Sequence, residues 1–170
     1  MIPKILGALL ILTGCGGFGM MICIAYRREE EMLVQLLHAL GFIQCELQFR
    51  LTPLPELCAQ AGANSKGRIS QFWICLSEEL CRQASPDASR CIPAAKESVG
   101  TLPQHVDRVL EMLSLSLGQF DIQGQLQALE STRNHCAAEL ESMRNGKETR
   151  LRSYQTLGIC AGAALVILLV

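Results

Sequence analysis

Hydrophobic residues recur at helical spacing through the middle of the chain, and strand-like alternation never persists. Residues 28–50 form the first such segment, and three glutamates occupy its first turn, where carboxylates suit the helix dipole. Its apolar stripe consists of Leu33, Leu36, Leu37, Leu40, Ile43 and Leu47. Gly41 lies beside the stripe, and we expect it to allow the close approach of another helix.

Three further helices are expected before residue 100. Thr52 is the predicted N-cap of a short helix with Pro53 at its first position, ending near Ala61 at Gly62. Residues 62–67 are predicted to form a loop, and residues 69–84 a helix. The inward-facing side chains of that helix are Ile69, Phe72, Trp73, Leu76 and Leu80. A loop at residues 85–87 then precedes a short helix that reaches about Val99.

Two more helices complete the middle of the chain. Residues 102–117 carry the apolar positions Val106, Val109, Leu110, Leu113 and Leu117, with Gly118 just after the helix end and Asp121 capping the last helix. The apolar or small positions of the last helix are Leu126, Leu129, Cys136, Leu140 and Met143. Inserting Arg133 gives steps of three and four, which is a heptad seam. Asn145 and Gly146 predict a kink or a break.

Both ends of the chain are uncharged, whereas all 16 acidic residues lie between Glu29 and Glu148. Residues 5–26 form an uncharged run whose helical length is about 33 Å, enough to cross a hydrocarbon core of about 30 Å. Residues 154–170 form a second, shorter run. We therefore predict an all-α protein in which a bundle of about six helices, residues 27–152, is flanked by an N-terminal and a C-terminal transmembrane helix.

The cations next to the two runs predict the orientation. Arg27 and Arg28 follow the first run, and Lys147, Arg150 and Arg152 precede the second. The positive-inside tendency places the middle domain in the cytoplasm and both termini outside.

An alternative is an exported helical protein anchored as a lipoprotein through Cys15. The tetrad Leu-Thr-Gly-Cys at residues 12–15 resembles a bacterial lipobox, and residues 23–25 loosely resemble a cleavage site. However, residues 16–26 remain apolar past Cys15, whereas processed signals usually turn polar there. Export would also place the cations near residue 150 on the wrong side of the second run.

The residues give little support to an enzyme or a metal site. The nine cysteines include no Cys-x-x-Cys pair, and the six in the middle domain fall mostly at apolar positions, as reduced core thiols do. The three histidines have no metal-ligand spacing with them. No phosphate loop or nucleophile elbow is found, so we expect no cofactor and no small-molecule substrate. A net charge of −1 gives no reason to expect a nucleic-acid partner.

Glycines crowd both predicted spans, among them Gly14, Gly17, Gly158 and Gly162. Small residues let helix backbones approach closely in lipid, so these positions are candidate packing sites, within the chain or on a partner. Their simple frequency in membrane helices is the competing explanation.

Residues 46–57, with the sequence ELQFRLTPLPEL, resemble a segment of the stage III sporulation protein AB family, Glu-(apolar)-x-Tyr-x-x-Thr-Pro-Leu-Pro-Glu. Residues 117–125 are similar to that family's Leu-Gly-x-x-Asp-x-x-x-Gln segment, and residues 154–158 resemble its closing Tyr-Gln-Thr-Leu-Gly. Phe49 replaces the usual tyrosine, which removes a hydroxyl and keeps the ring. The resemblance covers nearly the whole chain.

The resemblance implies a non-enzymatic component of the sporulation channel, a secretion-like complex in the mother-cell membrane facing the forespore. It also implies a cytoplasmic domain similar to the platform protein of type II secretion and type IV pilus machines. The implied partners are a cytoplasmic ATPase subunit and other membrane subunits of the channel. Candidate contact residues are Thr52, Pro53, Leu54, Glu56, Asp121 and Gln125. Helix capping alone explains Thr52, Pro53 and Asp121, so Glu56 and Gln125 are the stronger candidates.

Overall fold

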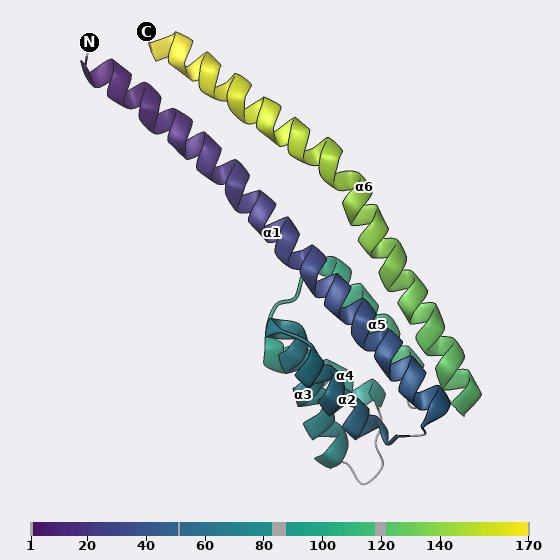
Figure 1. Cartoon of the computed structure of the whole chain (residues 1–170). Coiled ribbons are helices and arrows are strands. Elements are labelled where there is room, and N and C mark those ends of the chain that lie inside the picture. The colour runs from purple at the N-terminus through teal and green to yellow at the C-terminus, as the bar shows by residue number, and fades with distance from the viewer. Residues whose placement is uncertain (1, 51, 83–87, 118–121, 170) are drawn as a thin grey trace. The chain divides into compact units, whose positions relative to one another are not determined.

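The computed structural model describes the backbone of residues 2–50, 52–82, 88–117 and 122–169. The side chains described are those of residues 21–50, 52–82, 88–115, 117 and 123–146. Within these ranges every regular element is an α-helix (Figure 1). The helices are α1 (Ile2–Phe49), α2 (Leu54–Asn64), α3 (Gly67–Arg82), α4 (Ala88–Val99), α5 (Gln104–Ser116) and α6 (Ile122–Leu169).

The chain divides into two compact units. One comprises Met1–Arg28 and Glu141–Val170, and the other comprises Glu29–Leu140. The first unit contains the amino-terminal part of α1 and the carboxyl-terminal part of α6, and both chain termini lie at the same end of it (Figure 1). The second, which we call the helical unit, contains the rest of α1 and α6 with α2 to α5 between them.

The all-α prediction is confirmed, but the count of six includes the helices that continue into the predicted spans. Residues 27–31 contain arginine and glutamate, which are good helix formers, so nothing ends α1 after the apolar run. Of the kink or break predicted at Asn145 and Gly146, the break is absent because α6 continues through both residues, and the kink stays a prediction. A glycine in a helix interior costs about 1 kcal/mol relative to alanine, which is a small loss in so long a helix.

The core of the helical unit is made by the predicted apolar faces. In α1 the stripe from Leu33 to Leu47 is buried except for Leu37, which is half-buried. The five predicted positions of α3 and the five of residues 102–117 are all buried. Phe72 and Trp73 pack edge to face with ring centroids 5.2 Å apart.

The seam of α6 differs from its prediction at two positions, and at the first of them Leu126 is only half-buried. Thr132 is fully buried, whereas Arg133 is only half-buried, so threonine is the polar member of the core face. The Thr132 hydroxyl donates to the Ala128 carbonyl oxygen at 2.9 Å, which satisfies it within its own helix. Cys136 completes the contact with α1, since its Sγ lies 3.6 Å from the Leu33 carbonyl oxygen.

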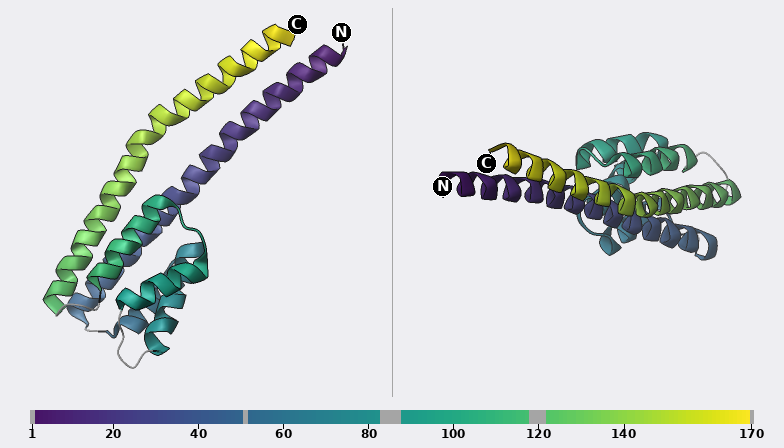
Figure 2. Two further views of the ribbon diagram at one scale, coloured as in Figure 1. Left: turned by 180° about the vertical axis from the view of Figure 1, so that it is seen from behind. Right: turned by 90° about the horizontal axis from the view of Figure 1, so that it is seen from above.

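Within the helical unit, α1 and α5 run in the same direction and α6 runs back beside them, while α2, α3 and α4 form a smaller cluster (Figures 1 and 2). As a result, the carboxyl ends of α1 and α5 and the start of α6 lie at one end of the unit (Figure 2).

Among the residues with described side chains, one segment, Met21–Phe49, is long and apolar enough to cross a membrane by length and composition. It weakly suggests a membrane association near the N-terminus. Much of its apolar surface is the buried stripe of the helical unit. The predicted spans at residues 5–26 and 154–170, and the orientation given to them, stay predictions.

Candidate functional site

The corner between α1 and α2 holds four of the candidate contact residues. Pro53, not Thr52, is the N-cap of α2, and no side chain caps the helix, so the predicted cap is wrong by one position. The Pro53 carbonyl oxygen accepts hydrogen bonds from the backbone N–H groups of Glu56 at 3.0 Å and Leu57 at 3.2 Å. Pro55 has no N–H group, so the first turn has one unsatisfied donor fewer and needs a side-chain cap less.

Two serine hydroxyls of α3 fix α2 in place. Ser77 Oγ donates to the Pro55 carbonyl oxygen at 2.8 Å, and Ser70 Oγ donates to the Gly62 carbonyl oxygen at 2.7 Å. Gly62 is buried inside α2, which runs on to Asn64, so the predicted helix end at Gly62 is wrong. Helix α3 therefore holds the corner between α1 and α2 in place. Neither serine was singled out from the sequence.

Glu56 and Pro53 face solvent at this corner. The Glu56 carboxylate accepts a 3.4 Å hydrogen bond from Gln60 Nε2, one turn along α2. Its place in the first turn suits the helix dipole. Phe49, the last residue of α1, exposes 75% of its surface beside the same corner. Thr52 and Leu54 are half-buried. The corner thus combines an exposed acidic group with an exposed ring.

The second candidate segment begins α6. Gln125 is half-buried one turn into the helix, and the start of α6 lies at the same end of the helical unit as the end of α1 (Figure 2). The structure therefore brings the described parts of the two family-like segments to one end of the unit. Gly118 and Asp121, predicted to end α5 and to cap α6, fall outside the described residues.

A charged cluster joins α5 to α6, and sequence analysis missed it. The Glu139 carboxylate oxygens lie 2.6 Å from His105 Nδ1, 3.5 Å from Arg108 Nη1 and 3.7 Å from His135 Nε2. The hydrogen bond from His105 lowers the pKa of Glu139 against the opposing effect of burial, and electrostatic interaction with His105, Arg108 and His135 lowers it further. The spacing of His105 with Arg108, and of His135 with Glu139, was the available signal.

The cysteines of the helical unit divide into core and surface thiols. Cys58, Cys91 and Cys136 are buried, as the core interpretation predicts, whereas Cys45 and Cys81 are exposed. Burial raises the pKa of Cys58 and of Cys136 to about 12, so both are poor nucleophiles. Within the described residues no group of three or more histidine, cysteine or acidic side chains is placed to hold a metal ion.

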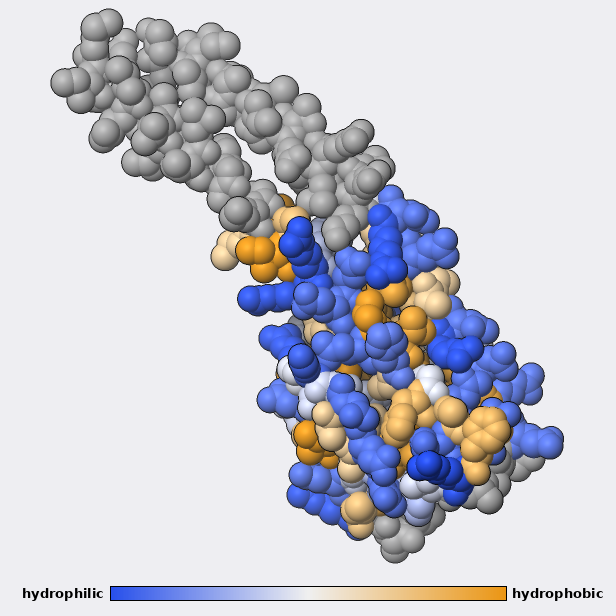
Figure 3. Space-filling view, in the orientation of Figure 1, coloured by the Kyte–Doolittle hydropathy of each residue, from blue (hydrophilic) through white to orange (hydrophobic). Residues whose placement is uncertain are grey.

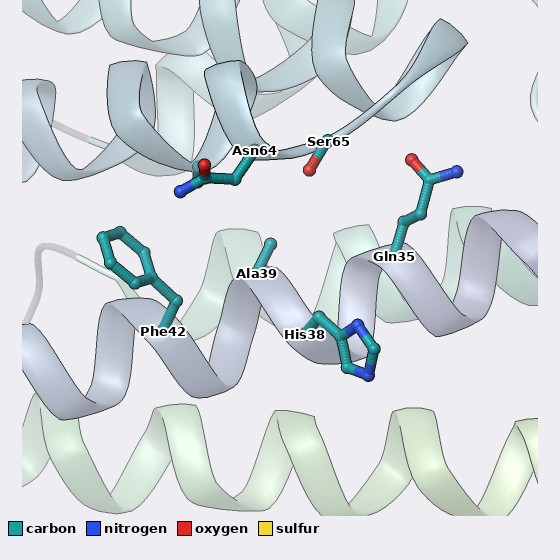
Figure 4. A pocket seen from close by; sticks show the side chains of 7 residues that line it. Gln35, His38, Ala39, Phe42, Asn64 and Ser65 are labelled. Atoms are coloured by element: carbon teal, nitrogen blue, oxygen red, sulfur yellow. The ribbon is translucent and has the colours of Figure 1, made fainter.

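A cavity of about 270 Å³ lies between α1 and the end of α2 (Figure 4). Gln35, Ala39 and Phe42 point into it from α1, and Asn64 and Ser65 close the opposite side. Gln35 Oε1 accepts a 2.7 Å hydrogen bond from the Lys66 backbone N–H, which ties α1 to the α2–α3 connection. His38 is the titratable side chain among the residues that line the cavity.

A comparison with protein families identifies the family of this chain. The family model of stage III sporulation protein AB matches residues 4–170, which is nearly the whole chain. The chain belongs to the stage III sporulation protein AB family. Membership supports a role in sporulation. It also confirms the family resemblance of residues 46–57 and 117–125. No curated protein and no solved structure gave a match.

The match to the stage III sporulation protein AB family spans the outer parts of α1 and α6 as well as the helical unit. The glycines Gly14, Gly17, Gly158 and Gly162 lie in these outer parts, among residues whose surroundings the structure does not describe. Their packing role stays a prediction.

Proposed function

We propose that this protein is a non-enzymatic membrane adaptor of the sporulation channel, a secretion-like complex, and that its helical unit binds the cytoplasmic ATPase subunit. Family membership supports the sporulation part of the proposal. The adaptor part rests on one observation: both family-like segments, residues 46–57 and the start of α6, lie at one end of the helical unit.

The chemistry of that end suits a protein contact. Glu56 is exposed and not required by the packing, and Phe49 exposes an aromatic ring next to it. Interfaces are enriched in aromatic residues, and an acidic residue at the rim gives a contact its specificity. The side chains with catalytic potential have packing roles. His105 and Glu139 join α5 to α6, and the thiols of Cys58 and Cys136 are buried.

In this proposal the two apolar ends anchor the protein in the mother-cell membrane facing the forespore, beside other membrane subunits of the channel. The helical unit faces the cytoplasm and its matched end presents Glu56 and Phe49 to the ATPase subunit. Its relation to the platform proteins of type II secretion and type IV pilus machines is part of the same proposal.

Co-purification from sporulating cells tests the proposal. Full-length tagged protein, solubilised in detergent, should retain the ATPase subunit. Glu56→Lys should reduce that subunit by about tenfold, as expected for reversing one interfacial charge. Glu130→Lys is the matched control, because Glu130 is an exposed acidic residue of α6 away from the corner, and it should leave the yield unchanged. A wild-type protein that never retains the ATPase subunit, or equal losses from both variants, would contradict the proposal.

A further inference from the structure

Two exposed cations, Lys66 and Arg68, lie where α2 connects to α3, and we call them the basic pair. Neither forms a salt bridge with another described side chain, whereas Arg82 of the same helix pairs with Glu79 at 2.9 Å. The basic pair supplies all the charged side chains of residues 57–77, which include no aspartate or glutamate. The two charges are therefore not balanced by acidic neighbours in sequence.

The position of the basic pair is fixed by two hydrogen bonds to other parts of the helical unit. The Lys66 backbone N–H donates to Gln35 Oε1 of α1 at 2.7 Å, and Arg68 Nη1 donates to the Thr101 carbonyl oxygen at 2.7 Å. Both acceptors are uncharged, so neither contact neutralises a cation. A guanidinium group has five N–H donors, so Arg68 keeps further donors for a ligand.

These hydrogen bonds place the basic pair at the end of the helical unit where α1 enters it. The unit begins at Glu29, and Gln35 follows six residues later, about 9 Å along α1. Thr101 precedes α5, which runs in the same direction as α1 and so begins at the same end (Figures 1 and 2). Figure 3 shows strongly hydrophilic side chains gathered there. The corner that carries Glu56 lies at the opposite end.

We propose that Lys66 and Arg68 bind anionic lipid headgroups, so that the connection between α2 and α3 rests on the membrane surface. This inference rests on the anchoring and orientation in the proposed function. The predicted span ends at residue 26, three residues before Glu29, so the membrane is the surface that this end of the unit faces.

Electrostatics favour this contact over the available distance. The cytoplasmic leaflet carries a negative surface potential, which attracts cations within a Debye length, about 8 Å at physiological ionic strength. Long cationic side chains also extend toward the headgroups. Each cation near such a surface strengthens lipid binding by about fivefold. Glu29, Glu30 and Glu31 of α1 lie at the same end and would be repelled, so the contact is assigned to the basic pair and not to α1.

Energy transfer from Trp73, the single tryptophan, to dansyl-labelled lipid headgroups measures how close α3 lies to the bilayer. Trp73 is six residues after Gly67, the first residue of α3, and therefore reports on the helix that begins at the basic pair. The full-length protein is reconstituted in nanodiscs of phosphatidylcholine, either alone or with about one third phosphatidylglycerol. Transfer efficiency should be about 1.5-fold higher with phosphatidylglycerol, and the rise should vanish in 1 M salt, where the Debye length is about 3 Å.

Two double variants separate the charges from the shape of the connection. Lys66→Gln with Arg68→Gln removes both charges and should abolish the rise in transfer. Lys66→Arg with Arg68→Lys keeps both charges while changing the same side chains, and should retain it. Arg90→Gln removes an exposed cation of α4 outside the basic pair and should also retain it. The emission of buried Trp73 shows in each case that the helical unit is folded.

The inference is overturned if the wild type gives equal transfer in the two kinds of nanodisc. It is also overturned if the charge-removing and charge-keeping variants give the same rise. Retention of the ATPase subunit is measured separately and depends on the opposite end of the unit, so it can succeed when the lipid contact fails. A chain that does not enter nanodiscs at all would contradict the anchoring in the proposed function, and the lipid contact with it.

Discussion

Gly62 of α2 faces Ile74 of α3 so closely that a Cβ on Gly62 would come within 2.8 Å of the Ile74 side chain. The same Cβ would lie 3.2 Å from the Ile74 backbone nitrogen and 3.3 Å from the Ser70 carbonyl oxygen. These backbone atoms cannot move without separating the two helices. The absent side chain therefore sets the distance between α2 and α3.

Gly62→Ala should consequently lower the free energy of unfolding by about 1–3 kcal/mol, because overpacking outweighs the gain in helix propensity. Thermal and chemical unfolding of the purified full-length chain, followed by circular dichroism, measures the change. The matched control is Gly41→Ala, where the added methyl group meets nothing and should stabilise by up to about 1 kcal/mol. Equal effects of the two substitutions would refute the close approach at Gly62.

Glu139→Gln should destabilise the helical unit at neutral pH by about 1 kcal/mol, because it removes the negative charge beside His105 and Arg108 and replaces one of the two acceptor oxygens with an NH2 group. The pKa of Glu139 is lowered in the folded state. Its contribution is therefore complete above the pKa of an unfolded glutamate, about 4.3, and is lost as the pH falls through the folded value.

The measurement is the difference in unfolding free energy between wild type and Glu139→Gln at a series of pH values from 7 down to about 3. The two curves should converge at the acidic end. Glu130→Gln, on the exposed side of the same helix, should differ from wild type by less than about 0.5 kcal/mol throughout. A constant difference between wild type and Glu139→Gln would show that the carboxylate charge contributes nothing.

Thiol alkylation should separate the cysteines into two classes. With a pKa of about 12, roughly one Cys58 thiol in ten thousand is ionised at pH 8, and burial also blocks the reagent. Cys45 and Cys81 are exposed and should react first under native conditions. Peptide mass spectrometry after a short pulse of iodoacetamide, with and without denaturant, resolves each site. Native labelling of Cys58 or Cys136 as fast as Cys81 would contradict the described core.

Trp73, the single tryptophan of the chain, gives a direct report on the core of α3. It is fully buried, so its fluorescence should be blue-shifted and weakly quenched by acrylamide, and both properties should change on unfolding. Phe72 touches it edge to face, and Phe72→Ala should cost about 3–5 kcal/mol. If quenching in the native state equals that of free tryptophan, the packing of α3 is not as described.

Sequence periodicity predicted the helices well where one face is buried. All five inward positions of α3 are buried because an amphipathic helix has one way to cover its apolar side. Periodicity failed at Gly62, where glycine was interpreted as a helix end although the helix continues. A glycine required by a neighbouring helix and a glycine that ends a helix look alike without the third dimension.

Sequence periodicity also failed to place the polar residues of α6. Thr132 and Arg133 are adjacent in sequence. Arg133 was assigned to the heptad seam because it makes the steps between seam positions alternate between three and four residues. The structure buries Thr132, whose hydroxyl is satisfied inside its own helix, whereas a buried guanidinium would need a partner. The cluster around Glu139 could not be assembled from the sequence, because its two local pairs meet only through a contact between residues 34 positions apart.

The contact between Cys136 and the Leu33 carbonyl joins residues 103 positions apart, whereas α2, α3 and α4 pack against their neighbours in sequence. During synthesis the smaller cluster can therefore assemble early, while the apolar stripe of α1 waits for most of the chain to leave the ribosome. Until α6 arrives, that stripe is an uncovered hydrophobic surface. Translation speed and chaperone supply, rather than final stability alone, should then limit how much of this protein reaches its folded state.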